Sequence, residues 1–195
     1  MSKRILIIDG HPDPAAQRFN HAIVSAYRLE AVGAGHEARS VALADLSFPL
    51  LHTKAEFDGI ATCAAVTSLQ ADILWCDHIV IVYPLWLGSM PALLKGLFEQ
   101  IFRPSFAFAQ TAYSDRPKGI LRGKSARVIV TMGMPAPIYR WYFGAHSLKS
   151  LQRNILAFCG IRPIRSCVIG SVGIASSAYH ARWITRIREL AKDAR

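Results

Sequence analysis

The sequence predicts an α/β protein in which helices alternate with the parallel strands of a doubly wound sheet. Two observations support this prediction. Four short runs are almost wholly apolar, as strands buried on both faces of a sheet are. These runs are Arg4–Gly10, His78–Tyr83, Ala126–Met132 and Arg165–Ile169. Helical patterns separate the runs, which is the order expected when helical crossovers connect parallel strands.

The remaining elements follow from local patterns. A fifth, peripheral strand is expected at His36–Leu43, where charged and small apolar residues alternate. Pro91 suits the first turn of a helix, and Ser176 or Ser177 can cap the last helix. The expected helices are Asn20–Val32, Thr67–Cys76, Pro91–Phe102, Ala145–Cys159 and Ser176–Asp193.

Two longer segments lack a clear period. Leu46–Ala65 is expected to be irregular, and Arg103–Lys124 is expected to be an excursion between a helix and a strand. Long loops of this kind border ligand clefts in α/β folds.

Length and composition favour a single domain over residues 1–195. At 52% hydrophobic and 18% charged residues, the chain can bury a core and is not intrinsically disordered. The most apolar stretch, Ile79–Leu94, contains Pro84 and Pro91 and is too short to span a membrane. No secretory leader is recognised, and the four cysteines have no zinc-site or redox-motif spacing. We therefore expect reduced thiols and a cytoplasmic protein.

The charge is concentrated in the second half of the chain. Residues 116–195 carry 15 Lys+Arg against 2 Asp+Glu, whereas residues 1–115 carry 8 against 11. A basic half can attract nucleic acid, but no nucleic-acid-binding motif accompanies it. Solvated arginines on helix faces explain the charge better, and a phosphorylated small cofactor would account for part of it just as well.

Ligands of open α/β sheets bind beyond the carboxyl ends of the strands, so the segments after the strands are the candidate site. Three segments qualify: Asp9–Asn20, Tyr83–Ser89 and Thr131–Pro135. In the first, the N–H groups that open a helix suit a phosphate, and His11 and Arg18 can add charge and hydrogen bonds. The alternative is a turn histidine and a solvated arginine. Asp9 and Asp13 are expected to be turn and cap residues.

The second segment suits a flat ring. Pro84, Trp86 and Gly88 place irregular backbone and a large aromatic side chain directly after a buried strand. This combination fits a heterocycle with hydrogen-bonding edges. The alternative is a core tryptophan that fills the junction between strand and helix.

The order of these motifs resembles the flavodoxin-like NAD(P)H:quinone oxidoreductases. The similarity rests on Ile-Ile-Asp-Gly-His-Pro, Phe-Asn, Tyr-Pro-Leu-Trp followed by Met-Pro-Ala-Leu-Leu-Lys-Gly, Thr-x-Gly, and Leu-Ala-Phe-Cys-Gly-Ile. It covers nearly the whole chain. The resemblance implies a flavodoxin-like sheet, a bound flavin (FAD, or FMN in shorter relatives), and two-electron reduction of quinones by NADH or NADPH. It also implies a homodimer.

The resemblance assigns roles by position. It places His11, Phe19 and Asn20 at the phosphate and ribityl side of the flavin, where Arg18 is also expected because of its charge. The residues expected along the edge of the isoalloxazine ring are Pro84, Leu85, Trp86 and Leu87, and the loop on the opposite side contains Thr131 and Gly133. The residues expected to support hydride transfer are Tyr139 and His146. For Tyr139 and His146 the alternative is simple packing along a loop rich in aromatic residues.

Other classes find less support. The seven histidines include no pair at i, i+4 and no HExxH, and no G-x-S-x-G occurs, so neither a metal site nor a hydrolase triad is predicted. The alternatives that remain are an azo or nitro reductase of the same fold and a non-catalytic flavodoxin-like binding module. Two aromatic segments, Trp141–Phe143 and Phe106–Phe108, are expected to be exposed in a monomer and hence to favour a dimer. The basic half favours NADPH, with Arg140 as the first choice for its additional phosphate.

Overall fold

The computed structural model describes residues 2–111 and 114–194, and the side chains of residues 110–116 lie outside that description. A five-stranded parallel sheet forms the centre of the protein, in the order β2-β1-β3-β6-β7. Its strands are β1 (Arg4–Asp9), β2 (Glu37–Ala42), β3 (His78–Pro84), β6 (Ser125–Thr131) and β7 (Ile164–Ile169). The predicted doubly wound α/β sheet is therefore confirmed, with the strand order of a flavodoxin-like fold.

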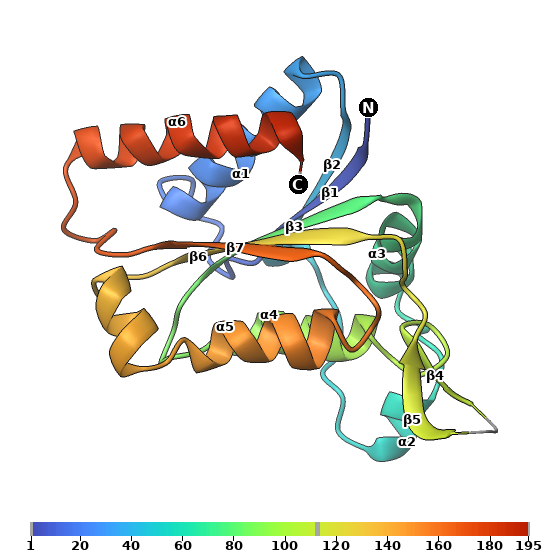
Figure 1. Cartoon of the computed structure of the whole chain (residues 1–195). Helices are drawn as coiled ribbons and strands as arrows, with labels where there is room; N and C mark the ends of the chain where they lie inside the picture. Colours follow the sequence, from blue (N-terminus) through green and yellow to red (C-terminus); the bar gives the residue numbers. More distant parts are fainter. Residues whose placement is uncertain (1, 112–113, 195) are drawn as a thin grey trace.

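Helices cover both faces of the sheet (Figure 1). On one face lie α1 (Phe19–Gly33) and α6 (Ser177–Asp193), which pack against each other. On the other face lie α3 (Ala64–Trp75), α4 (Ala92–Ile101) and α5 (His146–Ser150), and α5 continues into the π-helical segment η3 (Leu151–Leu156). Short helical segments are η1 (Leu43–Asp45), α2 (Lys54–Asp58) and η2 (Ile138–Tyr142). Ser176 caps α6 as predicted, because its hydroxyl accepts the Tyr179 N–H.

The apolar strands divide their side chains between two cores. In β1, Ile5 and Ile7 face α1 and α6, whereas Leu6 and Ile8 face α3 and α4. All four are essentially inaccessible to solvent. This alternation explains why the strands are continuously apolar in sequence, since each face is covered by helices.

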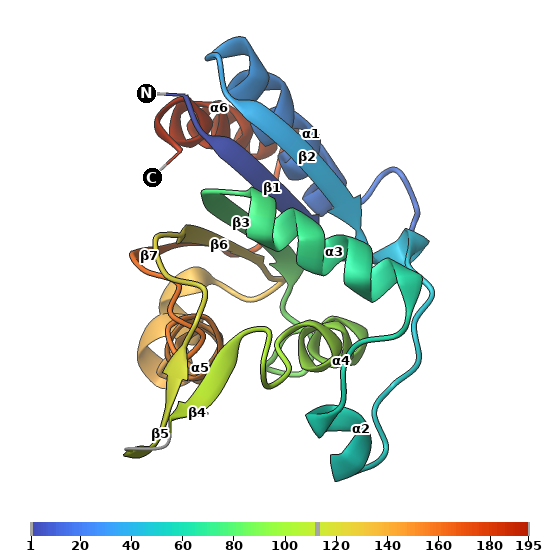
Figure 2. The ribbon, with the colours of Figure 1, turned by 90° about the vertical axis from the view of Figure 1, so that its right-hand side faces the viewer.

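The two segments expected to be irregular contain additional structure. Within Arg103–Lys124 the chain forms an antiparallel hairpin of β4 (Phe108–Thr111) and β5 (Ser114–Gly119), which lies on the same side of the central sheet as α4 and α2 (Figure 2). The segment Leu46–Ala65 contains α2, which buried Arg103 holds in place by donating to the carbonyl oxygens of residues 56, 59 and 60. The expectation that Phe106–Phe108 is exposed is wrong. Phe106 and Phe108 are half-buried, and the Phe108 ring lies 4.9 Å from that of Phe158.

The outer strands of the sheet carry arginines. Arg39 in β2 is exposed and pairs with Asp72, and its guanidinium stacks over Trp75 at 4.0 Å from the ring centroid. Arg165 occupies an exposed position in β7. Each edge strand of the sheet therefore carries an exposed arginine.

Candidate functional site

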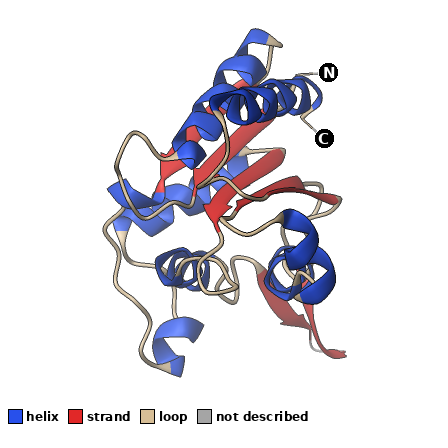
Figure 3. Ribbon diagram, turned by 90° about the vertical axis from the view of Figure 1, so that its left-hand side faces the viewer, coloured by secondary structure: helices blue, strands red, loops and turns tan. Residues whose placement is uncertain are grey.

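A cavity of about 370 Å³ opens at the carboxyl edge of the sheet, the edge that faces the viewer in Figure 3. It lies where the loops after β1, β3, β6 and β7 meet. Its lining consists of His11, Gln17, Arg18, Phe19, Asn20, Pro84, Leu85, Trp86, Thr131, Met132, Gly133, Val172 and His180. The structure thus brings together nine of the ten residues expected to bind the cofactor, and the tenth, Leu87, lies on the adjoining turn.

Asn20 carries an unsatisfied donor in this cavity. Its side chain is 4% exposed, and its Oδ1 accepts a hydrogen bond of 2.8 Å from the Thr131 hydroxyl. Its Nδ2 is buried without a hydrogen-bond partner in the protein. An unpaired buried amide is costly, so this atom requires an acceptor that a ligand can supply.

His11 presents a second donor. Its Nδ1 accepts the N–H of Asp13 at 3.1 Å, which leaves the proton of the neutral ring on Nε2. Burial lowers the pKa of His11 below its usual value, and the charge of neighbouring His21 lowers it further. The ring is also fixed by the edge of Trp86, whose centroid lies 5.8 Å away. His11 is therefore a neutral, oriented N–H donor.

The positive end of α1 adds to these donors. Within the described chain, no side chain caps the helix and no acidic residue occupies its first turn. Arg18, the residue before α1, pairs with Asp13 and is half-exposed. Uncapped N–H groups at a helix start, next to an arginine and a histidine donor, form a suitable environment for a phosphate.

The turn after β3 shapes the opposite wall. Trp86 and Ser89 exchange two backbone hydrogen bonds, of 2.8 and 2.9 Å, which closes a two-residue turn. Both central residues have positive φ, 46° at Leu87 and 77° at Gly88. This turn leaves Leu87 fully exposed and Trp86 47% exposed at the rim. A bulky residue in the left-handed region is uncommon and marks a strained position.

The part of the cavity wall that follows β7 was not predicted from the sequence. Val172 and His180 line the cavity, and the ring of His180 packs on that of Phe19 with centroids 4.4 Å apart. Nε2 of His180 faces the carbonyl oxygen of Val172 at 3.1 Å. The rule that selected the segments after the other strands would have found this one had it been applied to the run Arg165–Ile169.

Tyr139 and His146 do not line the cavity. Tyr139 is 2% exposed, and its hydroxyl is engaged with Ser147 Oγ at 2.7 Å and with the N–H of Leu148 at 3.1 Å. His146, at the start of α5, is exposed, and its ring covers Gly144. The internal hydrogen bonds of Tyr139 agree with the packing alternative, and the catalytic role of both residues stays a prediction.

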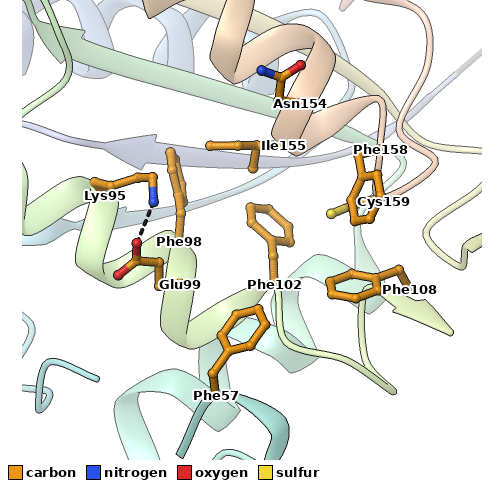
Figure 4. A pocket seen from close by; sticks show the side chains of 10 residues that line it. All are labelled: Phe57, Lys95, Phe98, Glu99, Phe102, Phe108, Asn154, Ile155, Phe158 and Cys159. Carbon is orange, nitrogen blue, oxygen red and sulfur yellow. Dashed lines mark hydrogen bonds and ion pairs between the residues drawn. The ribbon is translucent and has the colours of Figure 1, made fainter. Parts of the chain in front are cut away.

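A second cavity, of about 170 Å³, has a different character (Figure 4). It lies between α4, η3 and the hairpin, and is lined by Phe57, Lys95, Phe98, Glu99, Phe102, Phe108, Asn154, Ile155, Phe158 and Cys159. Lys95 and Glu99 neutralise each other in an ion pair. Burial raises the pKa of Cys159 to about 12, so its thiol stays protonated and unreactive. This second cavity offers little of the hydrogen-bonding chemistry found in the first.

Three further features bear on the class of protein. Across residues 2–111 and 114–194, no group of three or more histidine, cysteine or acidic side chains is placed to hold a metal ion. Over the same residues, none of the helices combines the length and apolarity needed to cross a bilayer. All four cysteines are free, with Cys76 and Cys159 buried.

The sheet order and the cavity at its carboxyl edge define a flavodoxin-like protein, and the chain belongs to that family: the family model described as "flavodoxin-like fold" matches residues 3–190. Among curated relatives, the chain is 29% identical over 140 residues to a human ribosyldihydronicotinamide dehydrogenase (quinone), a match that covers 66% of this chain and 58% of that protein. The chain thus spans a little over half the length of this relative.

Solved structures share the fold. A NAD(P)H:quinone oxidoreductase from Methanothermobacter marburgensis superposes with a TM-score of 0.85 at 18% identity, over 100% of both chains. An FMN-dependent NADH-azoreductase from Bacillus anthracis, solved in complex with FMN, gives a TM-score of 0.76 at 20% identity, over 99% of both chains. At these identities the similarity shows the fold alone.

Proposed function

We propose that this protein is a flavin-dependent oxidoreductase that oxidises NADPH or NADH and reduces quinones by two electrons. The observation that carries the proposal is the unsatisfied Nδ2 of Asn20, which lies with the Nε2–H of His11 in one cavity at the carboxyl edge of the sheet. The names of the human and Methanothermobacter relatives support the same chemistry.

The residues of the cavity fit a flavin. His11, Arg18 and the first turn of α1 would hold its phosphate, and Asn20 would donate to an oxygen of the ribityl chain or the ring. The flat heterocycle would lie along the turn at Pro84–Leu87, opposite the loop at Thr131–Gly133. A bound flavin accepts an electron pair from a nicotinamide and passes it on, while the protein supplies binding, orientation and exclusion of water.

We expect FAD in preference to FMN. The paired rings of Phe19 and His180 form an aromatic part of the cavity wall, against which an adenosine would pack. FMN is the alternative, as in the Bacillus anthracis relative.

We expect NADPH to serve at least as well as NADH. The positive charge of residues 116–195 raises the local potential for a 2′-phosphate. Arg140, exposed on η2, is our first choice for the contact. We also expect a cytoplasmic homodimer, since the cysteines are free and a patch of aromatic residues on η2 is uncovered.

The experiment is a titration of the purified protein with FAD and with FMN, followed by assays of NADPH and NADH oxidation with a soluble quinone. One flavin per chain and quinone-dependent oxidation are the expected results. An azo dye as acceptor tests the second candidate, azo reduction, which the Bacillus anthracis relative favours. If neither flavin binds at micromolar concentration, the proposal fails. Salt-dependent retention on DNA would then favour a non-catalytic module.

A further inference from the structure

His21 lies directly behind the loop that lines the cavity, and both nitrogens of its ring face oxygen acceptors. Nδ1 is 2.5 Å from Oδ2 of Asp9, and Nε2 is 3.0 Å from the main-chain carbonyl oxygen of Asp13. A neutral imidazole has only one N–H, so it can donate to only one of the two. Full hydrogen bonding therefore requires His21 to be an imidazolium.

The surroundings of Asp9 favour this charge. Asp9 is the last residue of β1 and is 4% exposed, and its carboxylate also accepts the N–H of His11 at 3.2 Å. A buried carboxylate requires a compensating charge, and the imidazolium of His21 supplies it. Burial by itself lowers the pKa of His21, but the hydrogen bond and the charge of Asp9 outweigh burial and raise that pKa above its ordinary value.

Asp13 connects this pair to the cavity. Its carbonyl oxygen accepts from His21, and its N–H donates to Nδ1 of His11. The rings of His21 and His11 lie 5.5 Å apart, with the peptide groups of Asp13 bonded to both. Protonation of His21 thus fixes the segment that holds the Nε2–H of His11 toward the cavity.

We propose that His21 is a positioning residue for the cofactor phosphate: its imidazolium, held between Asp9 and Asp13, orients His11, and loss of its proton weakens phosphate binding. This inference rests on the proposed function, since the phosphate is that of the flavin. His21 itself lies outside the lining of the flavin cavity and borders a separate cleft of about 360 Å³, through which its proton can exchange with water.

The direction of the pH effect follows from the groups that face His21. Asp9 and Asp13 favour the charged ring, and burial opposes it. The other charged groups nearby are Asp45, which lines the same cleft, and Arg18, which is paired with Asp13. The contact between His21 Nδ1 and Asp9 Oδ2, at 2.5 Å, is the shorter of the two hydrogen bonds of the His21 ring and determines the direction of the pKa shift. The contribution of His21 to phosphate affinity is therefore complete below its raised pKa and is lost as the pH rises through that pKa.

The test has two independent readouts. The first is the ¹⁵N chemical shifts of the His21 ring in the apoprotein, which we expect to show both nitrogens protonated at pH 7. The second is the dissociation constants of FMN and riboflavin between pH 6 and 9. We expect FMN to bind about tenfold more weakly once His21 is neutral, as for loss of one charge-assisted contact, and riboflavin, which lacks the phosphate, to show no such change.

Variants separate positioning from simple support of the fold. His21→Gln should abolish the FMN-specific pH dependence, and Asp9→Asn should move its midpoint to lower pH. His52→Gln, at an exposed histidine outside the cavity, is the matched control and should behave as wild type. The phosphate of FMN loses its own second proton near pH ~6, which acts equally in every variant.

The possible failures are distinguishable. A His21 ring with one unprotonated nitrogen at pH 7 overturns the inference, and so does an FMN pH profile that is the same in wild type and His21→Gln. If His21→Gln does not fold, the inference is tested by the midpoint of the FMN pH profile in Asp9→Asn and by the ¹⁵N chemical shifts of the His21 ring. If none of FAD, FMN and riboflavin binds, the proposed function fails and this inference fails with it.

Discussion

The hydroxyl of Thr131 donates a hydrogen bond of 2.8 Å to Oδ1 of Asn20, a residue 111 positions earlier in the chain. The bond joins the end of β6 to the first turn of α1 within the buried interior. It also orients the amide, because anchoring the oxygen leaves Nδ2 as the group available to a ligand. A residue at the end of β6 thus orients a hydrogen-bond donor on α1, the helix that follows β1.

Thr131→Val removes this anchor with little change in volume. We expect about 1–2 kcal/mol lower free energy of unfolding, because a buried acceptor loses its partner, and a several-fold weaker flavin affinity. Thr131→Ser retains the hydroxyl and should behave nearly as wild type. Urea denaturation and flavin titration measure the two effects, and equal flavin affinity in Thr131→Val and wild type would contradict the proposed orientation of Asn20.

Two tryptophans should respond in opposite ways to truncation. Trp86 is partly exposed at the cavity rim, so Trp86→Ala should weaken flavin binding about tenfold and leave stability nearly unchanged. Trp183 packs on the core between the sheet and α6, so Trp183→Ala should lower the free energy of unfolding by about 3 kcal/mol and leave flavin affinity intact. Equal losses of flavin affinity, measured at matched stability, would remove Trp86 from the site.

Leu87 tests whether strain at the turn serves binding. Its φ of 46° carries a cost for any side chain with a Cβ, so Leu87→Gly should stabilise the protein by about 1 kcal/mol. Thermal denaturation measures this gain. We expect flavin or quinone affinity to fall at the same time, since a fully exposed leucine at the rim of a cavity can contact a ligand. A gain in stability with unchanged affinity would show that the strain has no such role.

His78 should make stability depend on pH. Burial is the main cause that lowers its pKa to about 3, with nearby cations such as Lys3 and Arg127 adding to the effect. The unfolded chain therefore takes up a proton near pH 6.5 that the folded protein does not, and stability falls as the pH decreases from about 6.5 toward 3. The free energy of unfolding of His78→Gln should vary less steeply over this range than that of wild type or His52→Gln. Parallel slopes would mean that His78 is accessible to protons in the folded state.

The aromatic patch on η2 should control self-association. Trp141 and Tyr142 are 83% and 81% exposed, next to half-exposed Ile138 and Phe143. A second copy of the chain would cover this patch, so light scattering should give twice the chain mass of 21.5 kDa. Trp141→Ser combined with Tyr142→Ser should shift the protein toward the monomer. A wild-type mass of 21.5 kDa at working concentrations would contradict the dimer.

The sheet was predictable from sequence because strands buried on both faces are continuously apolar. The five expected helices were found within a few residues, although the π-helical end of the segment Ala145–Cys159 depends on packing that the sequence pattern does not reveal. The short segments η1, α2 and η2 were not predicted. The hairpin was not predicted, since its residues contact side chains distant in the sequence, as Phe108 contacts Phe158.

The site was predictable to the extent that it follows from position in the chain. Residues directly after strands converge at one edge of a parallel sheet, which brought Asn20, Trp86 and Thr131 together as expected. The pairing of Asp9 with His21 was not predicted. Asp9 was expected to be a turn or cap residue, and its partner depends on how α1 is rotated about its own axis.

The charged outer strands also constrain how the protein can assemble. An open sheet normally invites another chain to pair with its free edge, and charged side chains along the edge oppose such pairing. With Arg39 on β2 and Arg165 on β7, both free edges disfavour extension of the sheet into a neighbouring molecule. Self-association is therefore directed away from open-ended sheet growth and toward closed contacts through helices and loops, which protects a chain with so apolar a set of strands from aggregation.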